Sequence, residues 1–430
     1  MGKGELMTAG MFIIALLGCL FLGIPIFIAM MIPSTYYLLN VLNMQPIMAV
    51  SSFTAGLNKF STLCLPFFIL AASVMGKGQI GSRLLKFCRS IVGHMYGGIG
   101  MTAIVCCIII GAISGASTAG ILIIGALIYQ EMIDNGYPRG FSAGLICTVS
   151  SVGMLIPPGI AFVVYAMNTN TSVLKLFMGG LSSGIIMATV FAVYVYIYAR
   201  RHGVPRLPRI NFKEFCVAVK DSIWALGLPI IIIGTMYTGI CTPTEAAAIS
   251  AVYAIFVEMV IYRDVDFKML IDICGDCAKT VCTIYILLAA GQLLGYVMTL
   301  ARIPQLMEAM LGSTSRLMIL LVINIMFLIA GMFMGAGSSI VIIMPMVYQL
   351  ALKAGIDPIF LGNVVVTNLA IGMSTPPFGL NLFVSTKVMK LSFVEIVRSS
   401  MPFIMLTIVV LVIITLFPGL SMFLPNLLVE

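Results

Sequence analysis

The sequence predicts an all-α polytopic membrane protein built from two inverted repeats, each with one re-entrant hairpin. Hydrophobic residues make up 61% of the 430-residue chain and charged residues only 9%, whereas about 25% is usual in soluble domains. Apolar runs of about 20 residues, long enough to cross a bilayer, recur along the chain. Two of these runs are interrupted in the same unusual way. We therefore expect residues 1–430 to form a single integral membrane unit.

The two interruptions use the same residue types in the same order. The first consists of Ile113 to Thr118 (ISGAST), then Ser150 to Gly153 (SSVG) and Pro157-Pro158. The second consists of Gly335 to Ser339 (GAGSS), then Gly372 to Pro377 (GMSTPP). In membrane proteins, interrupted segments at matching positions of two halves indicate a solute and ion site.

Charge distribution orients the chain. Basic residues cluster around residues 77–89 and 200–213, whereas the expected turns at 33–45 and 168–172 carry no charge. The net charge of +8 thus follows the positive-inside pattern, which indicates no nucleic-acid partner and places the N-terminus in the cytoplasm. The first apolar run, 7–32, is too long for a signal peptide, so we expect it to be retained.

The first inverted repeat is expected over residues 1–200. Residues 79–96 would form an interfacial helix, followed by a hairpin at about 99–133 that enters from the cytoplasm and turns at 113–118. Residues 141–167 would then cross outward, with a break at 150–158.

Residues 201–240 are expected to form a linker and a connecting helix, with a crossing near 223–240. The second inverted repeat would occupy 241–430. We expect crossings at 243–262 and 281–300, an interfacial helix at 303–313, and a hairpin at about 317–351 that enters from outside. A segment at 358–385, broken at 372–377, and a last crossing at 402–424 would leave the C-terminus in the periplasm. The total is about nine crossings and two hairpins.

The two breaks suit ion binding. Backbone carbonyls freed at membrane depth can coordinate a hard cation together with Ser and Thr hydroxyls, and half-helix N-termini favour an anion. Each hairpin tip, facing its Pro-Pro break, could make one cation site with an anion held between the two. The alternative is that these small residues only permit close helix packing, as the GxxxG spacing of Gly111–Gly115 and Gly331–Gly335 allows.

Other chemistries find little support. The expected spans lack an Asp, Glu or His series that could relay protons, which favours sodium as the coupling ion. Both Gly-Lys pairs are followed by glycine, so no Walker A motif indicates ATP use. Cys274 and Cys277 have CxxC spacing without a second ligand pair, and the eleven cysteines are expected to pack as small apolar residues.

Two acidic residues need separate interpretation. Thr242 to Glu245 (TPTE) matches a capping box, with an ion or solute role for Glu245 as the alternative. Glu258 is expected near a cytoplasmic helix end, in contact with water.

Several motifs along the chain resemble one family, the large membrane (M) subunits of the tripartite ATP-independent periplasmic (TRAP) transporters. The matching stretches are Leu65 to Ala71 (LPFFILA), Ile113 to Gly115, Ile156 to Pro158, Thr242 to Ala248 (TPTEAAA), Gly355 to Pro358 (GIDP), Asn368 to Gly372 (NLAIG) and Thr375 to Phe383 (TPPFGLNLF). Each is short, but together they cover nearly the whole chain in family order.

The resemblance implies a sodium-coupled elevator-type transporter that carries an organic anion, often a C4-dicarboxylate or sialic acid. It implies a small four-helix membrane (Q) subunit as a separate chain and a periplasmic substrate-binding protein. The location implied is the bacterial cytoplasmic (inner) membrane, and no enzyme activity is implied.

The resemblance also implies site residues. One sodium ion would lie among Ser114, Gly115, Ser117, Ser150, Ser151, Gly153 and Pro157. A second sodium ion would lie among Gly335, Gly337, Ser338, Gly372, Ser374 and Thr375. The solute would contact Ser117, Thr118, Ser339, Ser374 and Thr375. Family members often have Asp where Gly335 stands here, and the sequence after Gly115 also departs from the family pattern, so the solute's identity is not transferred.

Two other readings stay open. One is a stand-alone sodium–anion symporter of the same broad fold, which would need no binding protein. The other is the membrane subunit of a sodium-pumping decarboxylase, which would be expected to have acidic residues at the breaks.

Overall fold

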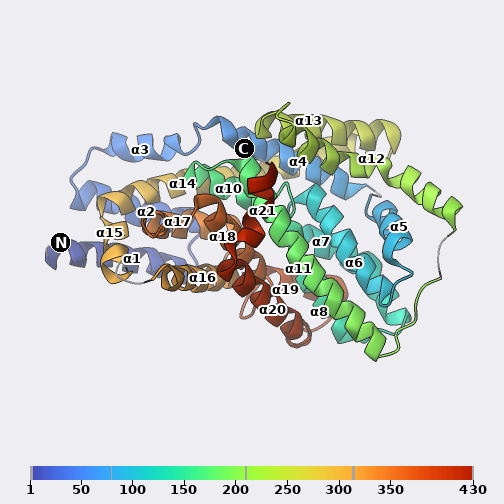
Figure 1. The fold of residues 1–430 in the computed structure, drawn as a ribbon. Coiled ribbons are helices and arrows are strands. Elements are labelled where there is room, and N and C mark those ends of the chain that lie inside the picture. Colours follow the sequence, from blue (N-terminus) through green and yellow to red (C-terminus); the bar gives the residue numbers. More distant parts are fainter. Residues whose placement is uncertain (1–2, 79, 209–210, 312–314, 429–430) are drawn as a thin grey trace.

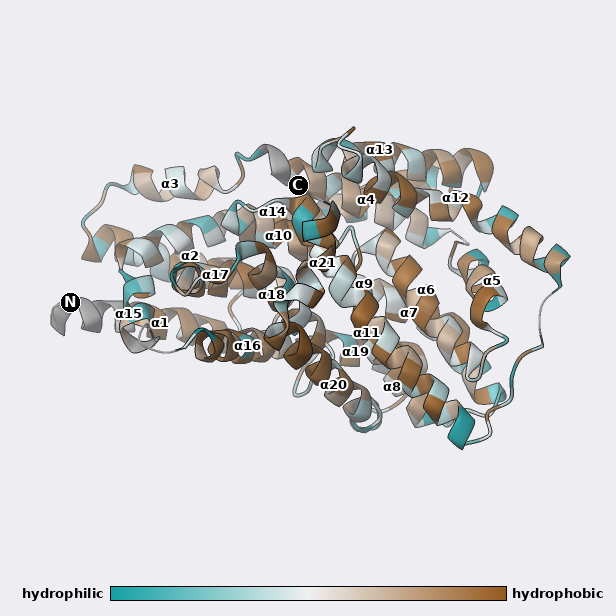
Figure 2. Cartoon of the chain, viewed as in Figure 1, coloured by the Kyte–Doolittle hydropathy of each residue, from teal (hydrophilic) through white to brown (hydrophobic). Residues whose placement is uncertain are grey.

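The computed structural model describes residues 3–78, 80–208, 211–311 and 315–428. Within these ranges every regular element is a helix. Seven helices are long and apolar enough to cross a membrane, or nine if each of two bent pairs is one span. Figure 1 shows them as one elongated body, and Figure 2 shows hydrophilic residues mainly near helix ends and connections.

The helices of the first half have the following bounds: α1 Lys3–Phe21, α2 Ile26–Tyr36, α3 Pro46–Ala55, α4 Cys64–Lys77, α5 Ile80–Val92, α6 Gly98–Ser114, α7 Ser117–Asp134, α8 Arg139–Val149, α9 Val152–Leu155, α10 Ile160–Thr169 and α11 Val173–Arg201.

The helices of the second half are α12 Phe212–Tyr237, α13 Pro243–Phe256, α14 Phe267–Leu300, α15 Ile303–Leu311, α16 Arg316–Phe333, α17 Ala336–Lys353, α18 Pro358–Gly372, α19 Leu380–Met389, α20 Phe393–Leu416 and α21 Pro418–Leu428. Short π-helical turns follow α2 at Tyr37–Val41 and α13 at Val257–Ile261, and a 3-10 turn precedes α4 at Phe60–Leu63.

Helix breaks lie at both predicted hairpin tips. α6 and α7 pack against each other around a break at residues 115–116, and α16 and α17 do so around a break at 334–335. The predicted broken segments are also interrupted, between α8 and α10 and between α18 and α19. Their inverted orientation relative to a membrane stays a prediction.

Backbone details recur between the two halves. Asn170 ends α10 in the left-handed conformation and Lys390 ends α19 in the same way, each with φ 53°. The two π-helical turns are also followed by residues with positive φ, Asn43 and Arg263. The predicted turn at 168–172 is confirmed, because Ser172 caps α11 by accepting from the Lys175 amide.

Helix packing sorts most elements into two groups. The first group contains α1 to α4 and α12 to α14, in which α4 packs on α13 and α14 packs on α2, α3 and α4. The second group contains α6 to α11 and α16 to α21. In the second group the halves interlock, because α7 packs on α19 and α17 packs on α10. The two groups meet where α14 packs on α17 and α4 packs on α6, and the helices α5 and α15 contact both groups.

Three predicted segments at the chain ends are wrong in detail. The run 7–32 is broken at residues 22–25, because Gly23 (φ +74°) and Pro25 end one helix and start the next. The turn predicted at 33–45 is helical up to Val41, since Pro33 is accommodated inside α2. The last crossing starts at Phe393, where Ser392 and Glu395 form a capping box, and it breaks at Phe417 before Pro418.

The helices of the central region begin earlier than predicted. α12 starts at Phe212 and α14 at Phe267, where Asp266 accepts a hydrogen bond from the Met269 amide. The first half of α14 is exposed on most of its circumference and contains four charged residues, and only Ile273, Cys277 and Val281 are buried there. The hydropathy of the sequence therefore predicted the start of α14 too late along the chain. Of the interfacial helices predicted at 79–96 and 303–313, α5 and α15 form within those ranges, and residues 79, 312 and 313 lie outside the described residues.

The TPTE capping box is confirmed. The backbone N–H of Thr242 donates to Glu245 Oε2 over 2.7 Å, and the Glu245 amide donates to Thr242 Oγ1 over 3.4 Å. Glu258, in contrast, was wrongly expected to be hydrated, because its side chain is 0% exposed.

Candidate functional site

The first hairpin tip lies directly on the first Pro-Pro break. Gly115 ends α6 with φ +60°, and a Cβ atom at this position would collide with the carbonyl oxygen of Pro158. Only glycine combines this backbone conformation with such a close approach. The entire break from Ser151 to Gly159 is buried.

The second hairpin tip contacts the second break in the same way but is more open. The Gly379 amide, just after Pro376-Pro377, donates to the carbonyl of Met332 near the end of α16 over 2.9 Å. Gly335 is exposed, with open space around its Cα, and Phe378 is 52% exposed. The two tips thus have similar contacts but different access.

Paired glycines bring helices together behind each tip. Gly111 of α6 lies against Gly153 of α9, and Gly331 of α16 lies against Gly372 of α18, so that a Cβ on Gly111 or Gly372 would overlap the facing backbone. These contacts support the packing interpretation for Gly111 and Gly331, the first glycine of each predicted GxxxG pair.

A buried polar cluster joins the two breaks, and we call it the Ser–Asn junction. It consists of Ser117 at the start of α7, Ser151 and Ser374 in the two breaks, and Asn381 at the start of α19. The Ser151 and Ser374 hydroxyls are 2.7 Å apart. Asn381 Nδ2 donates to Ser374 Oγ over 2.9 Å and to Ser151 Oγ over 3.2 Å, and Ser117 Oγ donates to Asn381 Oδ1 over 3.0 Å.

The Ser–Asn junction offers neutral oxygen ligands in a buried place. Three hydroxyl oxygens and one amide oxygen converge, and each of the four residues is at most 2% exposed. Hard cations prefer oxygen ligands, so this donor set fits sodium, provided that the ion replaces some of the internal hydrogen bonds. Among the described residues no group of three or more His, Cys, Asp or Glu could hold a metal ion.

The predicted site residues are therefore only partly brought together. Ser117 and Ser151, assigned to the first sodium ion, lie with Ser374, assigned to the second, in the one Ser–Asn junction. Ser150 turns toward Cys107 of α6, with its oxygen 3.8 Å from the sulfur, and donates to the Ile146 carbonyl.

Other predicted residues bond locally. Thr375 donates to the carbonyl of Ile371 over 2.7 Å, Ser339 donates to Gly335 over 3.1 Å, and Ser114 is 3.4 Å from the Ala116 carbonyl oxygen. Gly337, Thr118 and Ser338 are half-buried. Within the described part of the chain, no hydrogen bond joins these residues to the Ser–Asn junction.

Sequence reasoning missed Asn381 as a site residue. Its signal was present, because it is a polar residue between Leu380 and Leu382 in an apolar helix that follows a break. The side-chain amide of Asn381 donates two hydrogen bonds through Nδ2 and accepts one through Oδ1.

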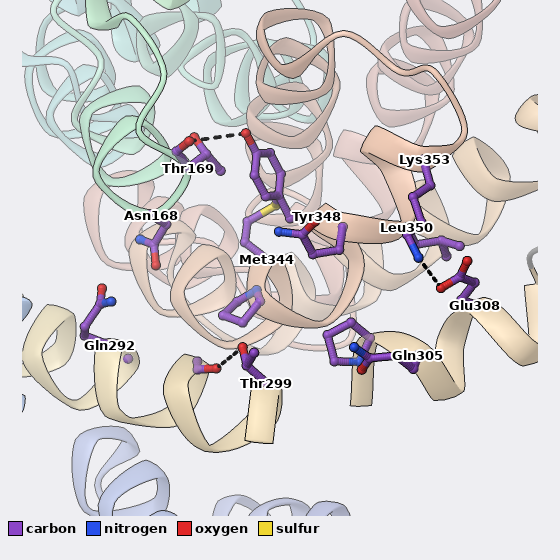
Figure 3. Close-up of a pocket in the computed structure, with 15 residues that line it drawn as sticks. Asn168, Thr169, Gln292, Thr299, Gln305, Glu308, Met344, Tyr348, Leu350 and Lys353 are labelled. Atoms are coloured by element: carbon purple, nitrogen blue, oxygen red, sulfur yellow. Dashed lines mark hydrogen bonds and ion pairs between the residues drawn. The ribbon is translucent and has the colours of Figure 1, made fainter. Parts of the chain in front are cut away.

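A separate polar cavity of about 350 Å³ lies between the two packing groups. Figure 3 shows its lining residues on α10, α14, α15 and α17. Lys353 Nζ and Glu308 Oε2 form an ion pair of 2.6 Å at one side, and Tyr348 donates to the Thr169 carbonyl over 3.2 Å. The side-chain amide of Gln292, half-buried in α14, makes no hydrogen bond within the part of the chain that the structure describes.

Lys59 also connects the packing groups. Its Nζ donates to the carbonyl of Met167 over 2.7 Å and to Asn170 Oδ1 over 3.2 Å, at the end of α10. Burial lowers the pKa of this ammonium. A cation at a helix C-terminus is stabilised by the unpaired carbonyl groups there.

Comparison with known proteins gives consistent matches. Residues 13–420 match the family model described as "Tripartite ATP-independent periplasmic transporter, DctM component". The chain is similar to a C4-dicarboxylate TRAP transporter large permease protein of Pseudomonas aeruginosa (38% identical, covering 85% of this chain and 86% of that protein). It is also similar to one of Vibrio cholerae with the same description (35%, 98% of each chain).

A further relative, from Ruegeria pomeroyi, is described as an ectoine/5-hydroxyectoine TRAP transporter large permease protein (33% identical, covering 88% of this chain and 89% of that protein). Among solved structures, the YdaH transporter of Alcanivorax borkumensis has a similar fold, with a TM-score of 0.62 at 13% identity, covering 86% of this chain and 87% of that chain.

Proposed function

Because this chain belongs to the DctM component family of the tripartite ATP-independent periplasmic transporters, we propose that it is the membrane permease subunit of a sodium-coupled, binding-protein-dependent secondary transporter. The solute proposed is a small organic anion, and the direction is import. The relatives' described solutes include C4-dicarboxylates and ectoine, so the carboxylate is the common chemical feature. No enzyme activity and no ATP use are proposed for the chain.

The observation that supports this proposal most is the Ser–Asn junction. Its hydrogen bonds join the first hairpin, through Ser117, to the second break, through Ser374 and Asn381. Sodium bound there would use the oxygens of Ser117, Ser151, Ser374 and Asn381 Oδ1. Since no acidic residue is present in the junction, an ion would add a positive charge that favours a nearby anion.

Helix N-termini add to this preference. α7 begins at Ser117 and α19 begins at Leu380, so that the positive ends of both helix dipoles lie at the breaks. A carboxylate of the solute would accept hydrogen bonds from such groups and from Thr118 and Thr375. This is the arrangement expected for an anion between two broken segments.

We propose an elevator movement between the two packing groups. The group with α1 to α4 and α12 to α14 would be the scaffold, and the group with both tips and both breaks would move. Its support is that α5 and α15 each contact both groups, and the direct contacts of α14 with α17 and of α4 with α6 would have to slide during the movement. The cavity at Gln292 and Tyr348 would receive the solute before the tips close.

The proposed partners follow from the family. They are a small four-helix Q subunit as a separate chain and a periplasmic binding protein that delivers the solute, in a bacterial inner membrane. The N-terminus would be cytoplasmic and the C-terminus periplasmic. A stand-alone symporter is the alternative that the same site would serve, whereas acidic residues expected of a decarboxylase subunit are absent from the Ser–Asn junction.

Uptake by proteoliposomes containing this chain with its Q partner tests the proposal. A labelled organic anion and the binding protein are added outside, with or without an inward sodium gradient. We expect uptake only when sodium and binding protein are both present. Sodium-driven uptake without the binding protein would establish the symporter instead, and uptake driven by a proton gradient without sodium would refute the coupling ion.

A further inference from the structure

A carboxyl group in the proposed scaffold group is buried and has no hydrogen-bond partner among the described residues. Glu258 lies in the π-helical turn after α13, and its side chain is 0% exposed. Neither Oε1 nor Oε2 makes a hydrogen bond with any described residue. An isolated charge in such a place is too costly to persist, so the group must be neutralised.

The carboxyl group lies on the connection between α4 and α5. A Cβ atom on Gly78, between these helices, would collide with Oε2 and lie 2.8 Å from the carboxyl carbon. A side chain at this position would therefore displace the Glu258 carboxyl group from its present place. Any displacement of α5 relative to α4 would change the surroundings of the carboxyl group.

Arg83 of α5 is the cation that pairs with an acidic residue in this region. Its Nη2 is 3.5 Å from Asp264 Oδ2, and its guanidinium lies 4.0 Å from the ring centre of Tyr262. The Nε of Arg83 is buried and has no partner among the described residues. Thus Asp264 occupies Arg83, and Glu258 is left outside that ion pair.

The remaining titratable neighbours supply no second positive charge. The hydroxyls of Tyr253 and Tyr262 donate to the backbone carbonyls of α12 residues Trp224 and Asp221, respectively. The side chains of Lys77, at the end of α4, and Arg263 are exposed. Two carboxyl groups and one guanidinium therefore share this region. Charge balance therefore requires one more positive charge near the two carboxyl groups.

The fold does not need an acid here. The matching residue of the other π-helical turn is Leu38, which is also 0% exposed. In both turns the carbonyl of this residue accepts a 3.0 Å hydrogen bond, from Met44 in the first half and from Asp264 in the second. A leucine can thus fill the position, so the carboxyl group of Glu258 has another use.

We infer that Glu258 is a proton-binding site at the α4–α5 connection. In this conformation the proton neutralises the carboxyl group. A movement of α5 that brings Arg83 from Asp264 to Glu258 would release the proton, because the guanidinium then provides the compensating charge. Proton occupancy is thereby linked to the position of the helix that leads into the first hairpin, independently of the solute and of sodium.

Thermal unfolding of the purified chain in detergent, measured across a pH series, tests this inference without any transport assay. Deprotonation would leave a buried negative charge, so we expect the wild-type midpoint to fall as pH rises. This fall should be lost in Glu258→Gln and also in Glu258→Leu, which copies Leu38. The control Glu245→Gln, altered at the exposed capping box of the same helix, should follow the wild type.

Two further measurements distinguish a proton from a metal cation at Glu258. Infrared difference spectra should contain a protonated-carboxyl band that disappears in Glu258→Gln, and Arg83→Gln should move the fall of the midpoint to higher pH. A wild-type pH dependence retained by both Glu258 variants would overturn the inference. So would a midpoint raised by sodium chloride, relative to choline chloride, in the wild type but not in Glu258→Gln, because the site would then bind a metal cation.

Discussion

The hydroxyl oxygens of Ser151 and Ser374 lie 2.7 Å apart although 223 residues separate them in the chain. Each belongs to the break of a different half, and both accept from the amide of Asn381. The two halves are therefore joined at their interrupted segments by direct side-chain hydrogen bonds.

A double-mutant cycle should measure this connection. Ser151→Ala and Ser374→Ala are each expected to lower the unfolding free energy, and their interaction energy should be about 1 kcal/mol, which is in the range measured for hydrogen bonds between membrane helices. Unfolding in detergent gives the values. Ser338→Ala, outside the junction, should cost less, and purely additive single effects would contradict the contact.

Asn381→Asp should increase the apparent sodium affinity. A carboxylate in place of the amide adds a charged ligand next to Ser117 and Ser374, so we expect the sodium concentration for half-maximal uptake to fall by ~10-fold, or about 1.4 kcal/mol. The measurement is uptake against sodium concentration. Gln130→Glu, at an exposed position of α7, is the control, and an unchanged sodium dependence would place the ion elsewhere.

Gly111→Ala should destabilise the chain by about 1–3 kcal/mol, because the added methyl group has no space against Gly153. Gly234→Ala is the matched control, since nothing lies within 4 Å of its Cβ position in the last turn of α12. Thermal midpoints of the two variants make the comparison. Equal midpoints would mean that α6 and α9 can separate at no cost.

Lys59→Met should loosen the contact between the packing groups at the end of α10. The carbonyl of Met167 and the side chain of Asn170 would lose their donor, so hydrogen exchange of the peptides around residues 56–63 and 167–172 should become faster. Lys268→Met, on an exposed turn of α14, serves as the comparison and should leave these peptides unchanged.

Gln292→Leu should weaken solute capture while leaving turnover intact. The amide borders the polar cavity between the groups, and none of the Ser–Asn junction residues lines that cavity. We therefore expect a higher KM with an unchanged kcat in the uptake assay. Tyr253→Phe, in the first packing group, is the control. A lower kcat at unchanged KM would instead assign Gln292 to the movement itself.

The features predicted correctly were those with local chemical signals. The small residues around Gly115 and Gly335 indicated both helix breaks, and the capping box at Thr242 marked the start of α13. Asn381 and Glu258 were misjudged because their surroundings include residues more than a hundred positions away, such as Ser117 for Asn381 and Gly78 for Glu258. Hydropathy averages contain no information on such tertiary contacts. They also placed the start of α14 too late, because charged residues lower the average over its first half.

The length of α14 has a consequence for where the bilayer ends. Its 34 residues extend about 51 Å at 1.5 Å per residue, whereas the hydrocarbon layer is about 30 Å thick. Unless the helix is strongly tilted, part of α14 therefore extends beyond the hydrocarbon layer. Three native cysteines lie in its first half. Cys274 and Cys282 are exposed and Cys277 is buried, so a water-soluble thiol reagent applied from each side would mark the depth at which this helix enters lipid.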